Sequence, residues 1–488
     1  MSNLKKFVIL HSNDMHGDFL AEVAGAEGEL IGGLALLSGY INQVRAEEEN
    51  VLYVIAGDMV QGSLIDSEYK GASTMEIMNY LAPDVVALGN HELDYGLPHL
   101  LFLEKVANFP IVNANLLITP HNKRLMRPHL IINKAGFDIL FTGIITEKVM
   151  DSLSRDSLIR SFVSLEEASQ AVGRIANAYK DDDIDLTILL THIGYESDLE
   201  LARLLDPAWG VDMIIGGHSH TVLSEPACEN GILVAQAGTG TNQIGRFDIV
   251  VDDDTNSIVE YSWRLIPIND KLAKPDPVLH DYIVSLQEKV DHKYNTLLCK
   301  LAVPLTHPAR TVETALGNLV ADALAEHAGC DVMLVGSGSI RVESVGPLVT
   351  LKDLLAMFPY DDSITRHEVS GAALKRAFAH FMRAENRTGE GECYQVNAGV
   401  QAVYSEGERC LVSLMVGGQP VEDGATYTLA LQDYQYRNAA RYLSIAHEEL
   451  LAGAHKVVTT SGQQVLEEYL RNHQNAVRHV EGRLVYVG

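Results

Sequence analysis

Basic residues are scarce in this chain. Its 37 lysines and arginines stand against 65 aspartates and glutamates, which gives a formal net charge of −28. A surface that binds a nucleic acid polymer or an anionic membrane needs clustered positive charge to displace counterions. The charge balance therefore argues against both kinds of partner. A small anionic substrate remains compatible with it, because bound divalent metal ions can make the local charge positive.

Cysteine is also scarce, and long apolar runs are absent. The five cysteines are odd in number, scattered and without a CxxC pair, which fits reduced thiols better than a disulfide framework. The first residues lead from two lysines straight into a strand-like run, without the apolar core and cleavage site of a signal peptide. No run reaches the roughly 18 to 20 apolar residues of a membrane span. We therefore expect a cytoplasmic protein and leave its oligomeric state open.

A chain of 488 residues is too long for one ordinary hydrophobic core, so it predicts two domains. Strand-like and helical stretches alternate between residues 7 and 268, which indicates a layered α/β domain. Residues 231–267 are rich in short strand candidates, and we expect them to add antiparallel strands to a second sheet.

A polar segment with two prolines follows this first region. Pro277 suits the first turn of a helix and Asp276 suits its N-cap, so we predict a helix from there to about Tyr294. The predicted organisation is a catalytic domain over residues 1–270, a linker with this helix over 271–295, and a second domain over 296–488.

Five short apolar runs each end a few residues before a side chain that can bind metal. Such runs, rich in Val, Ile and Leu, are typical of buried strands. Ligand-binding groups in α/β sheets gather beyond the carboxyl ends of strands, so five such ends predict one metal site. The runs and the residues that follow them are 7–10 with Asp14 and His16, 51–56 with Asp58, 85–88 with Asn90 and His91, 186–190 with His192, and 213–215 with His218 and His220.

Two of these motifs carry further information. In Gly89-Asn90-His91-Glu92-Leu93-Asp94, the carboxylate three residues after the histidine can meet the imidazole on one helical face. A histidine oriented in this way suits a positioned acid or an electrostatic stabiliser. In Gly216-Gly217-His218-Ser219-His220, the glycine pair permits close approach of the chain.

In this order, the five motifs resemble those of the calcineurin-like metallophosphoesterase superfamily, and their details are similar to its 5′-nucleotidase branch. The resemblance implies a four-layer α/β/β/α catalytic domain followed by an α+β substrate-binding domain. It also implies two divalent metal ions, with Asp58 bridging them. These ligand types suit Mn, Zn, Fe, Co and Mg and do not select one of these metals. One ion would be held by Asp14, His16, Asp58 and His220, and the other by Asp58, Asn90, His192 and His218.

The chemistry implied by the resemblance is hydrolysis at phosphorus. A metal-activated water would attack in line with the departing alcohol. His91, oriented by Asp94, would stabilise the phosphoryl oxygens or protonate the leaving group.

The second domain would recognise the substrate. By the resemblance, Arg310 and Arg341 would bind phosphate or carboxylate, which suits the guanidinium fork. Tyr360 matches the first of two aromatic rings that hold a base in this family. The motif expected around the second ring, Gly-Gly-Asp-Gly-aromatic, is absent. Tyr434 is the best candidate for that ring, with Tyr436 and Tyr442 as rivals.

These observations predict a phosphohydrolase of 5′-nucleotidase type that acts on nucleoside 5′-monophosphates or related phosphate esters. A second interpretation keeps the metal centre and changes the substrate to UDP-sugars, 2′,3′-cyclic nucleotides or esters without a nucleotide. A third is a nucleotide-binding module without catalysis. Substrate panels separate the first two, and nucleotide binding without turnover would favour the third.

Overall fold

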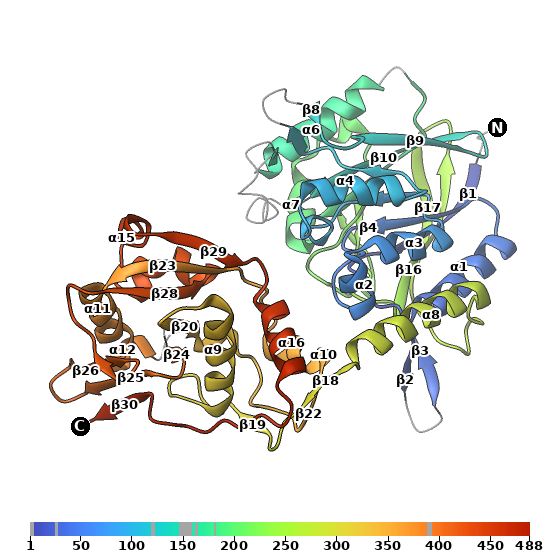
Figure 1. Cartoon of the computed structure of the whole chain (residues 1–488). Coiled ribbons are helices and arrows are strands. Elements are labelled where there is room, and N and C mark those ends of the chain that lie inside the picture. The colour runs from blue at the N-terminus through green and yellow to red at the C-terminus, as the bar shows by residue number, and fades with distance from the viewer. Residues whose placement is uncertain are drawn as a thin grey trace. The chain divides into compact units, whose positions relative to one another are not determined.

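The computed structural model describes residues 4–24, 28–118, 123–145, 159–161, 164–179, 182–387 and 393–488. The chain forms two compact units, Met1–Val290 and Asp291–Gly488 (Figure 1). The boundary between them falls inside the segment 271–295, which the sequence analysis assigns to a linker.

Two six-stranded sheets form the frame of the first unit. The first sheet has the order β17 (Ser257–Pro267), β16 (Gln243–Asp252), β1 (Leu4–Ser12), β4 (Val51–Ala56), β5 (Val85–Ala87) and β6 (Ile111–Val112). The second has the order β14 (Ala227–Glu229), β15 (Ile232–Ala235), β13 (Met213–Ile215), β12 (Leu186–His192), β10 (Phe137–Ile145) and β9 (His129–Lys134).

The two sheets pack face to face and helices cover their outer faces. Residues of β1, β4 and β16 share one buried core with residues of β10, β12 and β13. The other face of the second sheet packs against α6 (Leu165–Ala178) and α7 (Tyr195–Leu204). The first sheet is covered by α1 (Leu34–Glu47) and α3 (Ala72–Leu81), beside α2 (Leu64–Tyr69) and α4 (Leu97–Val106) (Figure 1). The predicted α/β/β/α layering is confirmed.

The expectation for residues 231–267 is wrong in one respect. The strands β16 and β17 are antiparallel, but they extend the sheet of β1 rather than a second sheet. Only β15 joins the second sheet, where it runs parallel to β13. Alternation along β16 places Phe247, Ile249 and Val251 in the core between the sheets, and this pattern satisfies either sheet equally well. Local pattern therefore cannot name the partner strand.

The predicted linker helix is α8 (Pro277–Tyr294), and it begins as expected. The Oδ1 of Asp276 accepts hydrogen bonds from the backbone N–H of Val278 at 3.0 Å and of Leu279 at 3.1 Å. Pro277 occupies the first turn, where a missing N–H has no consequence.

The second unit combines two larger sheets, each with parallel and antiparallel pairs, with separate helices, which confirms the predicted α+β class. One sheet has the order β24 (Tyr394–Val396), β20 (Val332–Gly336), β28 (Thr426–Gln432), β23 (Ile364–Ser370) and β29 (His455–Thr459), and the other β27 (Gln419–Pro420), β26 (Cys410–Val416), β25 (Val400–Ser405) and β30 (Leu484–Val487). The helices are α9 (Ala315–Ala328), α10 (Leu351–Met357), α11 (Gly371–Phe381), α12 (Ala384–Arg387), α13 (Asp433–Arg437), α14 (Ala439–Tyr442), α15 (His447–Ala452) and α16 (Gly462–Asn472).

Short elements complete both units. In the first they are β2 (Glu22–Ala24), β3 (Glu29–Ile31), β7 (Leu116–Ile118), β8 (Lys123–Arg124), β11 (Ile159–Ser161), η1 (His91–Leu93) and η2 (Pro207–Trp209). In the second they are β18 (Leu297–Lys300), β19 (Leu305–Thr306), β21 (Ser344–Val345), β22 (Leu348–Thr350) and η3 (Ser337–Ser339).

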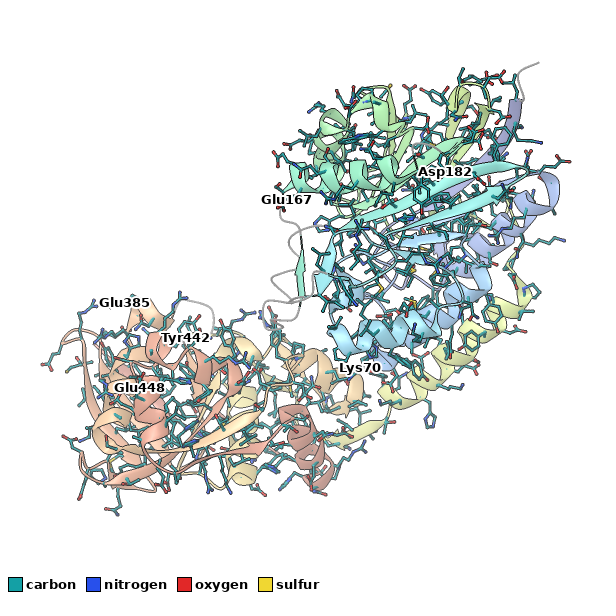
Figure 2. The ribbon with its side chains drawn as sticks, turned by 90° about the horizontal axis from the view of Figure 1, so that it is seen from above. Lys70, Glu167, Asp182, Glu385, Tyr442 and Glu448 are labelled. Carbon is teal, nitrogen blue, oxygen red and sulfur yellow. The ribbon has the colours of Figure 1, made fainter. Side chains whose placement is uncertain are left out.

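Charged side chains extend from the ribbons of both units (Figure 2), and the labelled Lys70, Glu167, Glu385 and Glu448 are all exposed. None of the five cysteines forms a disulfide. Among the described helices, none combines the length and the hydrophobicity that crossing a membrane requires.

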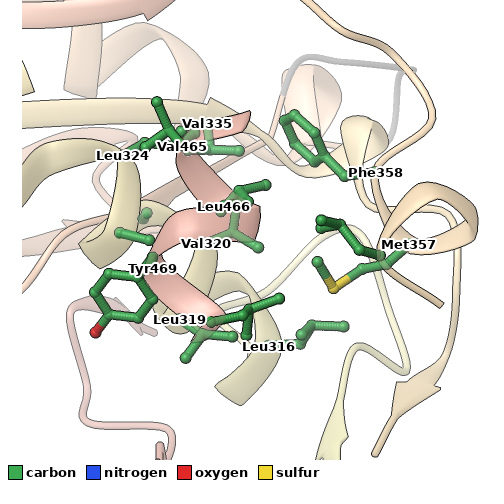
Figure 3. Packing of buried hydrophobic residues seen from close by; sticks show 14 of the residues in the cluster. Leu316, Leu319, Val320, Leu324, Val335, Met357, Phe358, Val465, Leu466 and Tyr469 are labelled. Atoms are coloured by element: carbon green, nitrogen blue, oxygen red, sulfur yellow. The ribbon is translucent and has the colours of Figure 1, made fainter. Parts of the chain in front are cut away.

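One core of the second unit packs α9 against α16 (Figure 3). Leu316, Leu319 and Val320 come from α9, and they meet Leu466 and Tyr469 of α16. Burial of such side chains stabilises the fold by about 1.5 to 3 kcal/mol each.

We expect Leu316→Ala to lower the free energy of unfolding by about 2 to 5 kcal/mol. The Leu316 side chain is fully buried, so its truncation leaves a cavity in the core. Urea denaturation followed by far-UV circular dichroism measures this change. Val312→Ala is the control, since Val312 is 41% exposed and its truncation should change stability by about 0.5 kcal/mol or less. Equal stability of the two variants would contradict the packing of α9.

Candidate active site

The five strand ends with metal-capable residues belong to both sheets of the first unit. The strands β1, β4 and β5 lie in the first sheet, and β12 and β13 lie in the second. The Nδ1–H of His192, at the end of β12, donates to the carbonyl oxygen of Ala56, at the end of β4, at 2.8 Å. The carboxyl ends of the two sheets therefore meet, and the predicted residues converge.

One set of side chains gathers around Asp14. Its Oδ1 lies 3.3 Å from the Nε2 of His220 and 3.9 Å from the Nε2 of His16. The two imidazole Nε2 atoms are 3.1 Å apart. These three residues present their ligand atoms within 4.8 Å of one another.

A second set gathers around Asp58. Its Oδ2 lies 3.0 Å from the Nε2 of His192. The Oδ1 of Asn90 lies 3.2 Å from that same Nε2 and 2.8 Å from the Nδ1 of His218. Asp58 also groups with His16, so it stands between the two sets. All seven residues proposed from the sequence as metal ligands thus lie together, in the same two groups.

The loops that carry these side chains have an unusual backbone. Asp14, His16, Asp58, His218 and His220 all have positive φ angles, between 49° and 79°. Non-glycine residues in this region carry strain of roughly 1 to 3 kcal/mol each, and such conformations persist only where the surroundings hold them. The backbone N–H groups of Asp14 and His16 donate to the carbonyl oxygens of Gly57 and Asp58 at 3.1 and 3.0 Å. Hydrogen bonds between the loops thus hold the strained turns.

Gly217 allows the loop after β13 to approach the others. A Cβ at this position would lie 2.6 Å from the carbonyl oxygen of Ala56 and 2.8 Å from the Nδ1 of His192. The close approach expected from the glycine pair is therefore present. It brings the backbone N–H of His218 to 2.9 Å from the Oδ2 of Asp14, which accepts its hydrogen bond.

Burial and charge act strongly on the ionisable groups. Burial raises the pKa of Asp14, and the charge of His192 opposes that rise. Burial would also raise the pKa of Asp58, but the hydrogen bond and charge of His192, together with the backbone N–H and charge of His91, outweigh this effect and lower the pKa to about 2. For His192, burial favours the neutral ring, but the hydrogen bond to Asp58 and the charges of Asp58 and Asp14 together raise the pKa to about 9.

His91 and Asp94 form the pair expected from their spacing. The Nδ1 of His91 lies 2.6 Å from the Oδ2 of Asp94, and this hydrogen bond raises the pKa of His91. The Nε2 of His91 lies 4.0 Å from the Oδ2 of Asp58. The ring therefore presents its Nε2 to the ligand cluster and remains partly exposed.

Glu92 is a residue whose role the sequence did not reveal. It is 1% exposed, and its carboxylate accepts four backbone hydrogen bonds. The donors are Gly89 at 2.6 Å, Met59 at 2.7 Å, Asp58 at 3.1 Å and Val60 at 3.4 Å. One carboxylate thus ties the loop after β4 to the loop after β5. Burial and the charge of Asp58 raise its pKa to about 7. Its position next to His91 was the one feature of the sequence that could have suggested a role at the site. Its hydrogen bonds with the backbone of residues 58–60 cannot be predicted from the spacing of the motifs.

Asp198 and Asn13 make hydrogen bonds that hold the cluster of candidate ligands in place. Asp198 is fully buried, and it accepts hydrogen bonds from Thr191 at 2.6 Å and from the Nε2 of Gln236 at 3.0 Å. The Nδ2 of Asn13 donates to Asp14 at 2.6 Å. These contacts fix the residues next to His192 and the carboxylate of Asp14.

The residues proposed for substrate binding line a pocket of about 300 Å³ within the second unit. Arg310, Arg341, Tyr360 and Tyr434 all contribute to it. The Nη2 of Arg341 donates to the hydroxyl of Tyr360 at 2.9 Å, and the guanidinium carbon lies 5.2 Å from the ring centroid. Gly338, Ser339, Asp362 and Gln435 complete the lining.

The structure separates the three candidates for the second ring. Tyr434 lines the pocket and is 47% exposed. Tyr442 is 5% exposed and packs in a core, and Tyr436 stacks on His367 with ring centroids 5.0 Å apart. Of these rings, only Tyr434 is at the pocket. Arg437 forms an ion pair with Asp433 at 2.7 Å.

Comparison with known proteins gives matches over both units. A sequence model of the calcineurin-like phosphoesterases matches residues 7–222, and one of the 5′-nucleotidase C-terminal domain matches residues 299–445. A snake venom 5′-nucleotidase of Naja atra is 28% identical over 82% of both chains, and a 5′-nucleotidase of Vibrio parahaemolyticus is 26% identical over 96% of this chain and 89% of its own. A 5′-nucleotidase precursor of Thermus thermophilus has the same fold, with a TM-score of 0.58, 23% identity and coverage of 99% and 100%.

The chain belongs to the 5′-nucleotidase family of calcineurin-like metallophosphoesterases. It is a hydrolase that acts on phosphate esters. The family implies divalent metal ions, and the residues in the first unit fit them. Two buried carboxylates, an amide oxygen and four imidazoles converge there without a lysine or arginine among them. Such nitrogen and oxygen ligands suit first-row divalent ions.

We expect Glu92→Gln to weaken Mn²⁺ binding about 10- to 100-fold, the usual effect of removing a residue that orients metal ligands. Glutamine leaves one acceptor oxygen and turns an N–H₂ group toward backbone donors. Titration calorimetry of Mn²⁺ into chelator-treated protein measures the affinity, and circular dichroism checks the fold. Glu104→Gln, at a surface ion pair with Lys105, is the matched control. An unchanged Mn²⁺ affinity in Glu92→Gln would show that the carboxylate does not position the ligands.

Proposed function

We propose that this member of the family hydrolyses nucleoside 5′-monophosphates, with two divalent ions in the first unit and a nucleoside pocket in the second. The observation that carries the proposal is the pair of ligand sets that meet at Asp58, beside the His91 and Asp94 pair. The pocket between half-exposed Tyr360 and Tyr434 supports the choice of a nucleoside, because exposed aromatic rings stack on planar bases.

In this proposal Asp14, His16, Asp58 and His220 hold one ion. The other is held by Asp58, Asn90, His192 and His218. When bound, the two ions supply Lewis acidity toward the phosphate oxygens and lower the pKa of water. The candidate ions are Mn, Zn, Fe, Co and Mg.

The remaining roles fall to side chains of the chain itself. Asp94 accepts the hydrogen bond from the Nδ1–H of His91 and so fixes the ring with Nε2 toward the ligand cluster. The Nε2 of His91 then donates to a phosphoryl oxygen or gives its proton to the departing alcohol. Arg310 and Arg341 bind anionic groups of the substrate.

The reduced cysteines support a cytoplasmic location, which we include in the proposal.

Related phosphate esters form the second candidate. Relatives with comparable similarity carry different names, among them an apyrase of Tabanus yao and the endonuclease YhcR of Bacillus subtilis. A family resemblance therefore fixes hydrolysis at phosphorus more firmly than it fixes the group that carries the phosphate.

We expect the purified chain to release phosphate from nucleoside 5′-monophosphates faster than from UDP-glucose, 2′,3′-cyclic AMP or p-nitrophenyl phosphate. Exhaustive chelation should abolish this activity, and added Mn²⁺ or another divalent ion should restore it, because in this proposal the bound ions supply the Lewis acidity and lower the pKa of the attacking water. Phosphate release measured before and after chelation tests both statements. Activity that survives chelation would refute the metal centre, and a preference for the other esters would refute the substrate.

We expect His91→Ala to keep its metal content and lose about 100- to 10,000-fold in kcat, the range typical for loss of a general acid or base. Metal analysis and steady-state kinetics on the same preparation measure the two quantities. His99→Ala is the matched control, because its ring packs on Phe102 and belongs to none of the groups of candidate ligands. Normal turnover of metal-loaded His91→Ala would remove His91 from the mechanism.

A further inference from the structure

The pocket of the second unit contains two oxygen acceptors that the proposed stacking and anion contacts do not use. They belong to Asp362, two residues after Tyr360 in the sequence, and to Gln435, which follows Tyr434 on α13. Both residues therefore line the same pocket as Tyr360 and Tyr434, the two rings proposed to stack on a planar group.

Gln435 presents an unsatisfied atom. The residue is 1% exposed and lines the pocket, and among the described residues its Oε1 has no hydrogen-bond partner. Buried polar atoms in folded proteins are nearly always hydrogen-bonded, and an orphan at a pocket wall is satisfied when a ligand supplies a donor. The Nε2 of this amide packs against Gly336, where an added Cβ would lie only 2.2 Å away. The side chain is thus fixed in place at the pocket wall, with its Oε1 as the unpaired acceptor.

Asp362 adds a negatively charged acceptor. Burial and the nearby carboxylate of Asp433 raise the pKa of Asp362, and the backbone N–H of Tyr434 donates to its carboxylate. One backbone donor leaves acceptor capacity on the two carboxylate oxygens. An ionised carboxylate accepts hydrogen bonds and cannot donate them, so a ligand group that faces Asp362 gains by carrying N–H donors.

We propose that Asp362 determines base specificity, together with the Oε1 of Gln435, and selects bases that present adjacent N–H donors. Guanine fits this requirement best, since its ring N–H and exocyclic amino group match the two oxygens of one carboxylate. Adenine and cytosine place an acceptor beside their amino group, and hypoxanthine lacks the amino group. The inference rests on the proposed function, because it assigns the base of the nucleotide to this pocket.

The test is a comparison of kcat/KM for GMP, IMP and ribose 5-phosphate in the metal-loaded full chain. GMP and IMP differ only in the amino group, and ribose 5-phosphate has no base. We expect GMP to be preferred over IMP about tenfold, the discrimination of one good bidentate pair. Asp362→Asn should bring this ratio close to one and leave ribose 5-phosphate unchanged, because the asparagine amide opposes one of the two donors.

Asp361→Asn is the matched control. It removes the same charge one residue away, where the Oδ1 accepts from Ser461 at 2.7 Å and from the backbone N–H of Gln463 at 3.1 Å, outside the pocket lining. It should keep the GMP preference. An unchanged ratio in Asp362→Asn, or an equal fall for all three substrates, would overturn the specificity role and leave the proposed function standing. Hydrolysis of ribose 5-phosphate without hydrolysis of any nucleotide would instead overturn the proposed function itself.

Discussion

The position of Asp58 is the constraint on which the catalytic unit depends. Its carboxylate stands between the two ligand sets, and it accepts the backbone N–H of His91 at 2.9 Å. Its own backbone has a φ of 53° and donates to the buried carboxylate of Glu92. A strained turn with both its backbone and its side chain held by the neighbouring loop cannot relax without moving Asn90 and His91. Contacts within the chain therefore hold the candidate ligands in position.

Charge organises the two units differently. In the first, carboxylates are buried among imidazoles, where burial and the mutual repulsion of the carboxylates favour bound cations. In the second, guanidinium groups and an acceptor pair line one pocket. In the proposed function, hydrolysis at phosphorus and recognition of the group that carries it thus depend on separate sets of residues. A family with this division can change its substrate by substitution in the second unit alone.

Much of the site was predictable because its chemistry is local in sequence. The seven candidate ligands follow five apolar runs, and the contact of His91 with Asp94 needs only a spacing of three residues. The helix start at Pro277 was predictable for the same reason. The support provided by Glu92 was not, because its donors at residues 58–60 are distant in sequence. The assignment of β16 and β17 also failed, since an alternating strand can satisfy either of two facing sheets.

The sequence by itself determined the types of candidate ligand and their order, because these depend on which side chain follows which buried strand. It indicated the hydrolytic class through the resemblance of these motifs to a known family. Only the tertiary structure decided that five strand ends from two sheets meet at one place, since strand pairing is a long-range choice. It also decided among Tyr434, Tyr436 and Tyr442, which are equivalent aromatic rings in sequence and differ only in burial. Side-chain exposure arises from packing against distant residues, and no local pattern encodes it.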